Sequence, residues 1–334
     1  MRHSTSPRVL STALSAVLLL FAAAAGAQSA KDLPGRQVKV AAITIGFGGN
    51  HDEKLKLALD HLETAGQNGV DIACLPEEFS GEKAEPVPGP TTNAVGELAK
   101  KHHMWVICPI REQDGDKEYN TAVLLDRGGN VAGYYRKVYV FWSENVHAGR
   151  EGVKVFDTDF GRISMLTCFD ANFSELWSEA DAKGAEIVFW PSAYGGGAPL
   201  NGYAMIYGYY VVPVGWGNII DCTGVNVAPV EKPREKQFIA TLDLDRTFVH
   251  KDYTRDKVAR LLKEHAGEVE LERDCDMEGW NLIRSVKPGV RVRDLCKQYK
   301  IETLQEYRHR SRAQITERRN ADKRIAADDK GNPL

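Results

Sequence analysis

Short apolar segments rich in β-branched residues alternate along this chain with segments that have the periodicity of amphipathic helices. The expected strands are 38–44, 72–75, 104–110, 122–125 and 131–135, and the expected helices are 52–65, 91–101 and 174–183. The expected N-caps of these helices are Asn50 or His51, Thr91 or Thr92, and Ser174. Regular alternation of this kind predicts an α/β fold in which helices cover a sheet.

One of the apolar runs stops at a cysteine. In residues 163–173, ISMLTCFDANF, the run ends at Cys168 and an acidic turn follows at Asp170. The end of a strand is where an α/β enzyme presents reactive side chains, because the sheet fixes the side chain and the next loop leaves it accessible. The alternative is that Cys168 is a structural residue, since free cysteine is among the most buried residue types.

Two upstream segments carry charged residues in comparable positions. Glu77 follows Pro76 at the end of an apolar run, and proline cannot continue the hydrogen-bonded ladder of a strand. Lys137 follows Arg136 in the strand-like run 131–140. Each feature alone is a weak signal, because a lysine in a strand is often a solvated edge charge.

In this chain order the three segments resemble the nitrilase superfamily of carbon–nitrogen hydrolases, which use a glutamate, a lysine and a cysteine. The matching motifs are LPE at 75–77, YRK at 135–137 and CFD at 168–170, and similar connecting segments are YNTAV at 119–123, FDTDFGR at 156–162 and GAEIVFWPS at 184–192. The resemblance covers about residues 38–245. It implies a four-layer α-β-β-α sandwich that hydrolyses a non-peptide C–N bond without a cofactor.

The resemblance also implies a role for each residue of the triad. Cys168 is the expected nucleophile and Glu77 its general base, since a free thiol is only a few per cent thiolate at neutral pH. Lys137 and the backbone N–H of Phe169 are expected to stabilise the tetrahedral oxyanion, where a fixed donor contributes several kcal/mol. Water activated by Glu77 would then hydrolyse the thioester.

Other carboxylates near these motifs are further candidates. Glu144 lies in the loop between Lys137 and Cys168, and it is the closest match to a second active-site glutamate found in amidase branches of the family. Glu144 is expected to be a second acid of the site. The alternative is that Glu144 is a solvated charge in a loop. Glu78 competes with Glu77 for the role of base, but the motif places the catalytic carboxylate directly after the proline.

The residues after Cys168 indicate which branch of the family this chain resembles most. Phe169 and Asp170 are more typical of amidases and N-carbamoyl hydrolases than of nitrile hydrolysers, which carry tryptophan and glutamate there. Asp170 and Asn172 are expected to fix the turn by capping backbone groups, and Tyr194 is a candidate substrate-binding residue. The segment 203–210, YAMIYGYY, departs from the residues that the family usually has there, which line the pocket and the dimer contact. The substrates of the family therefore do not transfer directly.

The N-terminus predicts export. Residues 1–27 read as a signal peptide, because Arg2 and Arg8 precede an apolar stretch and an A-x-A site ends at Ala27. Cleavage after Ala27 would give a secreted or periplasmic protein that is no longer attached to the membrane. A transmembrane anchor is the alternative, but the apolar stretch is barely long enough. The predicted domains are a signal peptide at 1–27, a hydrolase domain at 38–250 and a C-terminal extension at 251–334.

The C-terminal extension is expected to be helical. Helices are predicted at 254–265, capped by Thr254, and at 301–325, which is dense in arginine and glutamate. The second helix could dock on another subunit or could be a solvated helix with a frayed end. The family resemblance implies a homodimer or a higher homo-oligomer.

Charge and cysteine content exclude some classes of partner. The net charge of −3 leaves no basic footprint for nucleic acid, and no residue spacing resembles a metal cluster. Among six cysteines in an exported chain, Cys168 must stay free to react, and Cys222, Cys275 and Cys296 could supply one disulfide. Cys275–Cys296 is the favoured pair because both lie in the extension.

Three functions therefore remain at this stage. The first is hydrolysis of a small amide or N-carbamoyl compound through an acyl-enzyme on Cys168. The second is a non-catalytic relative in which the same fold only binds. The third is an unrelated cysteine–histidine hydrolase, which would need His147 or His250 beside the thiol.

Overall fold

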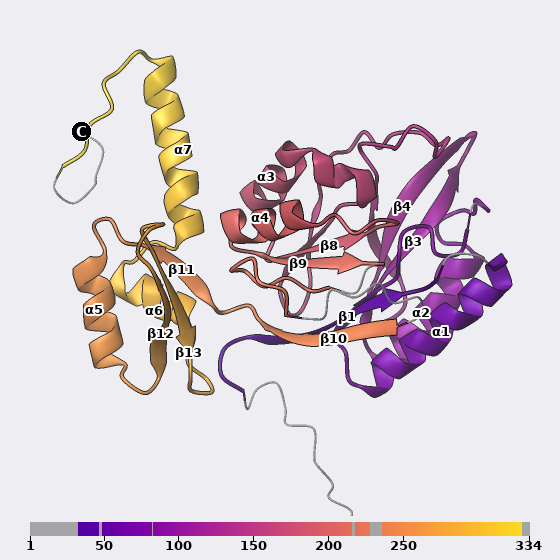
Figure 1. The fold of residues 1–334 in the computed structure, drawn as a ribbon, viewed down its shortest axis with the longest axis horizontal. Coiled ribbons are helices and arrows are strands. Elements are labelled where there is room, and N and C mark those ends of the chain that lie inside the picture. The colour runs from indigo at the N-terminus through magenta and orange to yellow at the C-terminus, as the bar shows by residue number, and fades with distance from the viewer. Residues whose placement is uncertain (1–32, 47–48, 82, 216–217, 228–235, 329–334) are drawn as a thin grey trace, which may run out of the picture.

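A computed structural model describes residues 33–46, 49–81, 83–215, 218–227 and 236–328, and the predicted signal peptide lies outside these ranges. Two sheets pack face to face between two pairs of helices, which gives the predicted four-layer α-β-β-α sandwich (Figure 1). A smaller unit made by the C-terminal residues stands beside this sandwich (Figure 1). Among the described helices, none combines the length and the apolar character that a membrane span requires.

The larger sheet has six strands in the order β10-β1-β2-β3-β4-β5. Its strands are β1 (Gln37–Thr44), β2 (Ile72–Cys74), β3 (Trp105–Asp114), β4 (Lys117–Leu125), β5 (Val131–Arg136) and β10 (Lys236–Asp243). On β1, Val40 and Ala42 point into the core between the two sheets, whereas Ala41 and Ile43 pack under the helices α1 (His51–Gln67) and α2 (Pro90–His102). This period of two follows from the alternating side chains of a strand that is buried on both faces.

The smaller sheet has four strands in the order β6-β7-β8-β9. They are β6 (Val155–Asp157), β7 (Arg162–Met165), β8 (Ile187–Pro191) and β9 (Tyr210–Val214), and the helices α3 (Ser174–Ala182) and α4 (Ala198–Tyr207) cover their outer face. Tyr203 of the aromatic segment 203–210 stacks on Trp177 of α3, with ring centroids 4.5 Å apart. Tyr209 donates its hydroxyl to the Trp177 carbonyl at 3.4 Å. These tyrosines therefore pack α4 and β9 against α3.

The C-terminal unit contains a sheet that the sequence did not predict. Three antiparallel strands in the order β11-β13-β12 pack with two helices, α5 and α6, around a separate core, and a third helix, α7, lies outside that core. These elements are β11 (Thr247–His250), α5 (Arg255–Glu264), β12 (Val269–Cys275), β13 (Trp280–Ser285), α6 (Val292–Tyr299) and α7 (Leu304–Asn320). The predicted helices correspond to α5 and α7. The extension is thus a small α/β unit and not a purely helical arm.

The last long helix docks on the sandwich at its N-terminal end. Gln305 donates to the Asp181 carboxylate of α3 at 2.9 Å, and His309 lies 3.2 Å from the same side chain. Arg308 donates to the carbonyl of Ile206 at the end of α4. The first turns of α7 are therefore fixed to their own chain, in agreement with its position beside α3 and α4 in Figure 1.

The predicted N-caps were correct for α1 and wrong for two other helices. Asn50 caps α1 by accepting from the Glu53 N–H at 3.0 Å. The N-cap of α2 is Gly89, not a threonine, because Pro90 starts the helix and Thr92 turns back to accept from the Gly89 N–H at 2.7 Å. The N-cap of α3 is Phe173, so Ser174 is the first helical residue and caps nothing. Thr254 occupies the N-cap position of α5, but its hydroxyl donates to a carbonyl of the preceding strand and caps no helical N–H.

The predicted disulfide between Cys275 and Cys296 is wrong. All six cysteines are free thiols. Cys275 ends β12 and packs against the core of the sandwich, whereas Cys296 lies on α6 in the separate core of the C-terminal unit. The two thiols therefore belong to different packing clusters.

Candidate active site

The three residues of the predicted triad come from the ends of strands in both sheets. Glu77 lies in the turn that follows β2, and Lys137 comes directly after β5. Cys168 follows β7 and opens the short 3₁₀ helix η2 (Cys168–Asn172). Sheet packing thus brings together side chains that are sixty and thirty-one residues apart in the chain.

Lys137 is buried between two carboxylates. Its Nζ lies 2.9 Å from Glu77 Oε1 and also donates to Glu144 Oε1. Burial lowers the pKa of the Lys137 ammonium, but the negative charges of Glu77 and Glu144 more than offset this effect and raise that pKa above its usual value. Lys137 is therefore a fixed cation at neutral pH.

Both carboxylate oxygens of Glu77 accept hydrogen bonds. Oε1 accepts from Asn120 Nδ2 at 2.8 Å in addition to Lys137, and Oε2 accepts from the Ala193 N–H at 2.9 Å. Its negative charge also acts on the thiol of Cys168 and raises the pKa of that thiol. The carboxylate is therefore positioned to take the thiol proton, as a general base must be.

The environment of Cys168 keeps its thiol protonated in the resting state. Burial, followed by the negative charge of Glu77, raises the pKa of this thiol to about 12, while Lys137 and a hydrogen bond from Ser192 act in the opposite direction. A thiolate at neutral pH must therefore form as the proton moves to a base. The backbone of Cys168 has φ +48, and Trp190 Nε1 donates to its carbonyl at 3.0 Å. A non-glycine residue in this left-handed region carries strain that the surrounding structure has to hold.

Asp170 fixes the turn that presents the thiol, as the sequence predicted. Its buried carboxylate accepts from the Thr167 N–H at 2.9 Å, from the Tyr135 hydroxyl at 2.7 Å and from the Tyr139 N–H at 2.9 Å. These bonds join the start of η2 to β5 and to the segment after Lys137. Asn172 holds the far side of the turn by donating to the Phe169 carbonyl at 3.1 Å.

Glu144 is part of the cluster and not a solvated loop charge. In addition to Lys137, its carboxylate accepts from Asn120 Nδ2 at 3.2 Å and from the Phe141 N–H at 3.2 Å. Glu78 has no contact with the Lys137 ammonium among the hydrogen bonds of the described residues. The geometry thus favours Glu77 over Glu78 as the partner of Cys168 and Lys137.

The two predicted substrate-binding residues lie beside the thiol. The Phe169 N–H is in the first turn of η2, where a backbone donor has no acceptor within the helix. The Phe169 ring packs edge-on against Phe141, with centroids 5.3 Å apart. Tyr194 follows Ala193, the residue that donates to Glu77, and its hydroxyl accepts from Asn172 at 3.4 Å. Tyr194 is 36% exposed, so part of its ring is open to solvent.

Two site residues were missed by the reasoning from sequence. Asn120 is a buried polar residue in the middle of β4 and bridges Glu77 and Glu144. Ser192 follows β8, accepts from the Tyr194 N–H at 3.0 Å and lowers the pKa of the Cys168 thiol. The available signal for Asn120 was an amide in an otherwise apolar strand. The available signal for Ser192 was its position directly after a strand, which Cys168 shares.

The histidines of the cysteine–histidine alternative lie elsewhere. His147 is exposed and contacts the Glu118 carbonyl at 3.2 Å, and His250 stacks on Tyr307 with centroids 4.1 Å apart. Neither histidine has Cys168 among its partners in the described part of the chain. Within the same residues, no group of three histidine, cysteine, aspartate or glutamate side chains could hold a metal ion.

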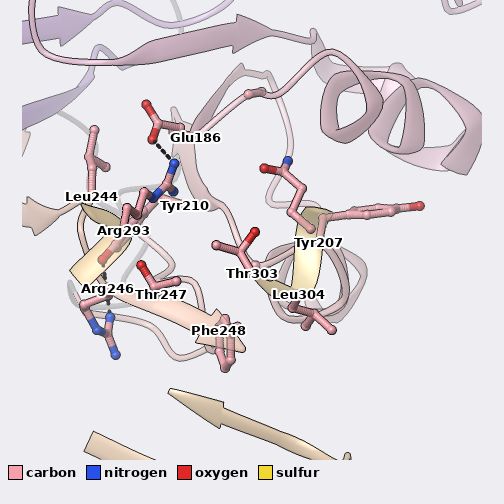
Figure 2. Close-up of a pocket in the computed structure, with 13 residues that line it drawn as sticks. Glu186, Tyr207, Tyr210, Leu244, Arg246, Thr247, Phe248, Arg293, Thr303 and Leu304 are labelled. Atoms are coloured by element: carbon pink, nitrogen blue, oxygen red, sulfur yellow. Dashed lines mark hydrogen bonds and ion pairs between the residues drawn. The ribbon is translucent and has the colours of Figure 1, made fainter. Parts of the chain in front are cut away.

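Figure 2 shows a hollow between the sandwich and the C-terminal unit, with none of the triad in its wall. Its volume is about 50 Å³, which is room for only one or two water molecules. Arg293 lies 3.0 Å from Glu186, and Arg246 lies 3.0 Å from Asp221. The charges of this small cavity are thus paired within the protein, and it offers no reactive group.

Comparison with known proteins assigns the family. The family described as Carbon-nitrogen hydrolase matches residues 39–247, which is more than half of the chain. The chain belongs to this family. The match begins in β1 and ends at the start of β11, so it covers the sandwich and the triad and leaves out nearly all of the C-terminal unit.

Curated relatives of this carbon–nitrogen hydrolase include two kinds of enzyme. The beta-ureidopropionase of Arabidopsis thaliana is 36% identical over 162 residues, which are 42% of this chain and 39% of that protein. The omega-amidase NIT2 of Xenopus tropicalis is 28% identical over 162 residues, which are 42% of this chain and 58% of that protein. The chain thus spans between about two fifths and three fifths of the length of these relatives.

Solved structures support the fold. Nit3 of Saccharomyces cerevisiae, a member of branch 10 of the nitrilase superfamily, superposes with a TM-score of 0.56 at 23% identity, over 63% of this chain and 91% of that one. The amidase from Nesterenkonia sp. AN1, also of the nitrilase superfamily, superposes with a TM-score of 0.57 at 19% identity, over 69% of this chain and 97% of that one. The α-β-β-α sandwich is the fold of these proteins.

Proposed function

We propose that this carbon–nitrogen hydrolase cleaves the non-peptide C–N bond of a small amide or N-carbamoyl compound through an acyl-enzyme on Cys168. The observation that carries this proposal is the contact of Glu77 with the Lys137 ammonium at 2.9 Å, at a site where the charges of both residues act on the Cys168 thiol. A base, a nucleophile and a fixed cation gathered at one site are the groups that acyl transfer requires.

In the proposed reaction the Cys168 S–H bond breaks, its proton passes to Glu77, and sulfur attacks the carbonyl carbon. Lys137 and the Phe169 N–H stabilise the oxyanion of the tetrahedral intermediate. Ammonia or an amine leaves with the proton returned by Glu77, and a thioester remains on Cys168. Water then loses a proton to Glu77 and attacks the thioester. The C–S bond breaks, and the proton passes from Glu77 to sulfur, which releases the acid and restores the thiol and the carboxylate.

Glu144 has a supporting role in this proposal. Its carboxylate accepts from Lys137, Asn120 and the Phe141 N–H, so it fixes the position of the ammonium relative to Glu77. The second carboxylate also keeps Lys137 charged during the reaction, when Glu77 is transiently neutral. Glu144 therefore orients the cation as an acceptor of hydrogen bonds in this proposal, and its expected role as a second acid stays a prediction.

Two classes of substrate have equal support. The relatives include a beta-ureidopropionase, whose name indicates a ureido compound, and omega-amidases. A carbamoyl carbon and an amide carbon are both open to attack by sulfur, and both give an anionic oxygen for Lys137 to stabilise. A panel of primary amides, N-substituted amides, carbamoyl amino acids and nitriles, assayed for released ammonia or amine, separates these classes.

Changing Glu77 to glutamine tests the role of the base. Glu77→Gln preserves the shape of the side chain but cannot accept the thiol proton, so we expect the hydrolysis rate to fall by about 10²–10⁴-fold. The measurement is kcat/KM with the best substrate of the panel, together with the alkylation rate of Cys168.

Glu85→Gln is the matched control for this change. Glu85 is a buried carboxylate that accepts from the Thr91 N–H at 3.0 Å and has no contact with the triad. Its variant should keep activity within about twofold of the wild type, as surface and remote changes generally do. A loss of less than tenfold in Glu77→Gln would remove Glu77 from the proposed role of base.

Export and assembly remain proposals as well. The predicted signal peptide at 1–27 lies outside the described residues, so its support is the sequence pattern alone. We expect the protein isolated from the producing cell to begin at Gln28, as N-terminal sequencing would show. An unprocessed Met1 terminus would contradict this proposal. The expected homo-oligomer stays a prediction.

A further inference from the structure

Arg111 of β3 is a buried arginine whose guanidinium binds a loop beside the triad. The residue is 6% exposed, although arginine is rarely buried unless its charge and its donors have partners. Its Nη2 atom donates to the carbonyls of Glu144, at 2.5 Å, and of Asn145, at 3.2 Å. Its Nε atom lies 2.9 Å from the carboxylate of Glu118 on β4. The guanidinium therefore joins the larger sheet to the backbone of the loop that carries Glu144.

The ion pair with Glu118 does not account for this burial. The Glu118 side chain is 42% exposed, whereas that of Arg111 is 7% exposed. An ion pair with one solvated partner contributes little to stability, while moving a guanidinium out of water is costly. The two loop carbonyls are the other partners of the guanidinium, so the role of Arg111 lies in the loop that it holds.

The loop at 141–146 has little else to fix it. It contains no helix or strand, and Trp142 is 94% exposed. The backbone of Asn145 lies in the left-handed region with φ +53, which a non-glycine residue rarely adopts. Among the hydrogen bonds of the described residues, Arg111 is the only side chain outside the loop that binds its backbone.

The position of this loop decides where the Glu144 carboxylate lies. That carboxylate accepts from the Lys137 ammonium and from Asn120 Nδ2 at 3.2 Å. Lys137 in turn lies 2.9 Å from Glu77 Oε1. A displacement of about 1 Å at a catalytic group can cost about 100-fold in rate. A loop that moves away from β3 would therefore take the Glu144 carboxylate away from Lys137 and leave the ammonium held on one side.

We propose that Arg111 is a positioning residue, whose bonds to the loop carbonyls hold the Glu144 carboxylate on the Lys137 ammonium. Arginine suits this task because its planar guanidinium binds several acceptors in one fixed geometry, which a lysine cannot do. Arg111 itself has no hydrogen bond to the triad in the described part of the chain. The inference rests on the function proposed above, in which Lys137 stabilises the oxyanion and Glu144 orients Lys137. It applies to amide and carbamoyl substrates alike.

Arg111→Ala removes the bonds to the loop. We expect kcat per folded protein to fall about 10- to 100-fold with KM within about threefold of the wild type, because a misplaced ammonium affects the transition state more than substrate binding. Arg111→Lys, which keeps the charge without the planar fork, should give an intermediate kcat, and it serves in place of the alanine variant if that variant does not fold. Arg127→Ala is the matched control. Arg127 donates to the His103 carbonyl at 2.5 Å and to Asp159 at 2.9 Å and has no partner in the triad, so its variant should keep kcat within about twofold.

Glu144→Ala tests whether Arg111 acts through Glu144. With no carboxylate left to position, Arg111→Ala/Glu144→Ala should be as active as Glu144→Ala alone within about twofold, since residues that act through one another are not additive. A purely structural role would lower the melting temperature of Arg111→Ala and leave its kcat per folded protein unchanged. That result, or losses that multiply in the double variant, would overturn the proposal.

Guanidinium added to Arg111→Ala gives a readout that a structural role would not move. The Glu118 side chain reaches solvent at this position, so the ion at about 50 mM, far below the molar range that unfolds proteins, should raise kcat at least about threefold. The same concentration of potassium chloride, and guanidinium added to Arg127→Ala, should leave the rates unchanged. An Arg111→Ala enzyme that guanidinium does not activate would contradict the proposal. Failure of the proposed function would appear differently, as absence of hydrolysis by the wild type with every substrate of the panel.

Discussion

Replacing Cys168 with alanine is expected to reduce hydrolysis by at least about 10⁴-fold, since loss of the nucleophile removes the covalent route and leaves only binding and electrostatic stabilisation. The thiol is the group on which the charges of Glu77 and Lys137 act at this site. The measurement is ammonia or amine release by Cys168→Ala, compared with the wild type at equal concentration of folded protein.

Cys275→Ala is the matched control for this variant. Cys275 is the most accessible of the other five thiols and lies at the end of β12, in the C-terminal unit. Its variant should retain activity within about twofold, because a change remote from the site has little effect. Turnover in Cys168→Ala close to that of Cys275→Ala would rule out sulfur as the nucleophile.

Replacing Lys137 with methionine should damage both activity and stability. Methionine has a similar volume but no charge, so the buried carboxylates of Glu77 and Glu144 would face each other without a cation. Breaking a buried ion pair in this way costs about 3–5 kcal/mol of unfolding free energy. Loss of the oxyanion donor should lower kcat by a further factor of about 10²–10³. Urea denaturation and steady-state kinetics measure the two effects.

Two comparisons separate charge from packing in this experiment. Lys56→Met removes an exposed lysine that pairs with Asp60, and it should cost less than about 1 kcal/mol. The double variant Lys137→Met/Glu144→Gln removes one carboxylate as well, so it should recover part of the lost stability and none of the activity. Equal stability of Lys137→Met and the wild type would contradict the buried ion cluster.

The triad could be predicted because three segments, each ending a strand-like run, resemble the motifs of one family in the same chain order. Glu77 comes after a proline, Lys137 after a β-branched run, and Cys168 after an apolar strand. Asn120 and Ser192 could not be assigned, since nothing local distinguishes a polar residue that orients a catalytic group from one that only satisfies its own hydrogen bonds. Their roles depend on contacts between distant strands.

The C-terminal unit shows where reasoning from sequence fails. The strand β12 reads VELERDC, in which four of the seven residues are charged, so the segment lacks the apolar composition that suggests a strand. The proposed pairing of Cys275 with Cys296 failed for a related reason, because it assumed that both residues share one core. The predicted N-caps of α2 and α3 were misplaced by up to three residues. Pro90 is the first residue of α2 and Phe173 is the N-cap of α3, and neither N-cap uses a side-chain hydrogen bond that the sequence would reveal.

The most direct test of this account is the intact mass of the protein quenched in acid during turnover of the best substrate from the panel. The account predicts a mass increase equal to the acyl or carbamoyl group, located on the peptide that contains Cys168 and absent from Cys168→Ala. Release of ammonia or amine at the wild-type rate by Cys168→Ala, with no adduct on any cysteine, would contradict it.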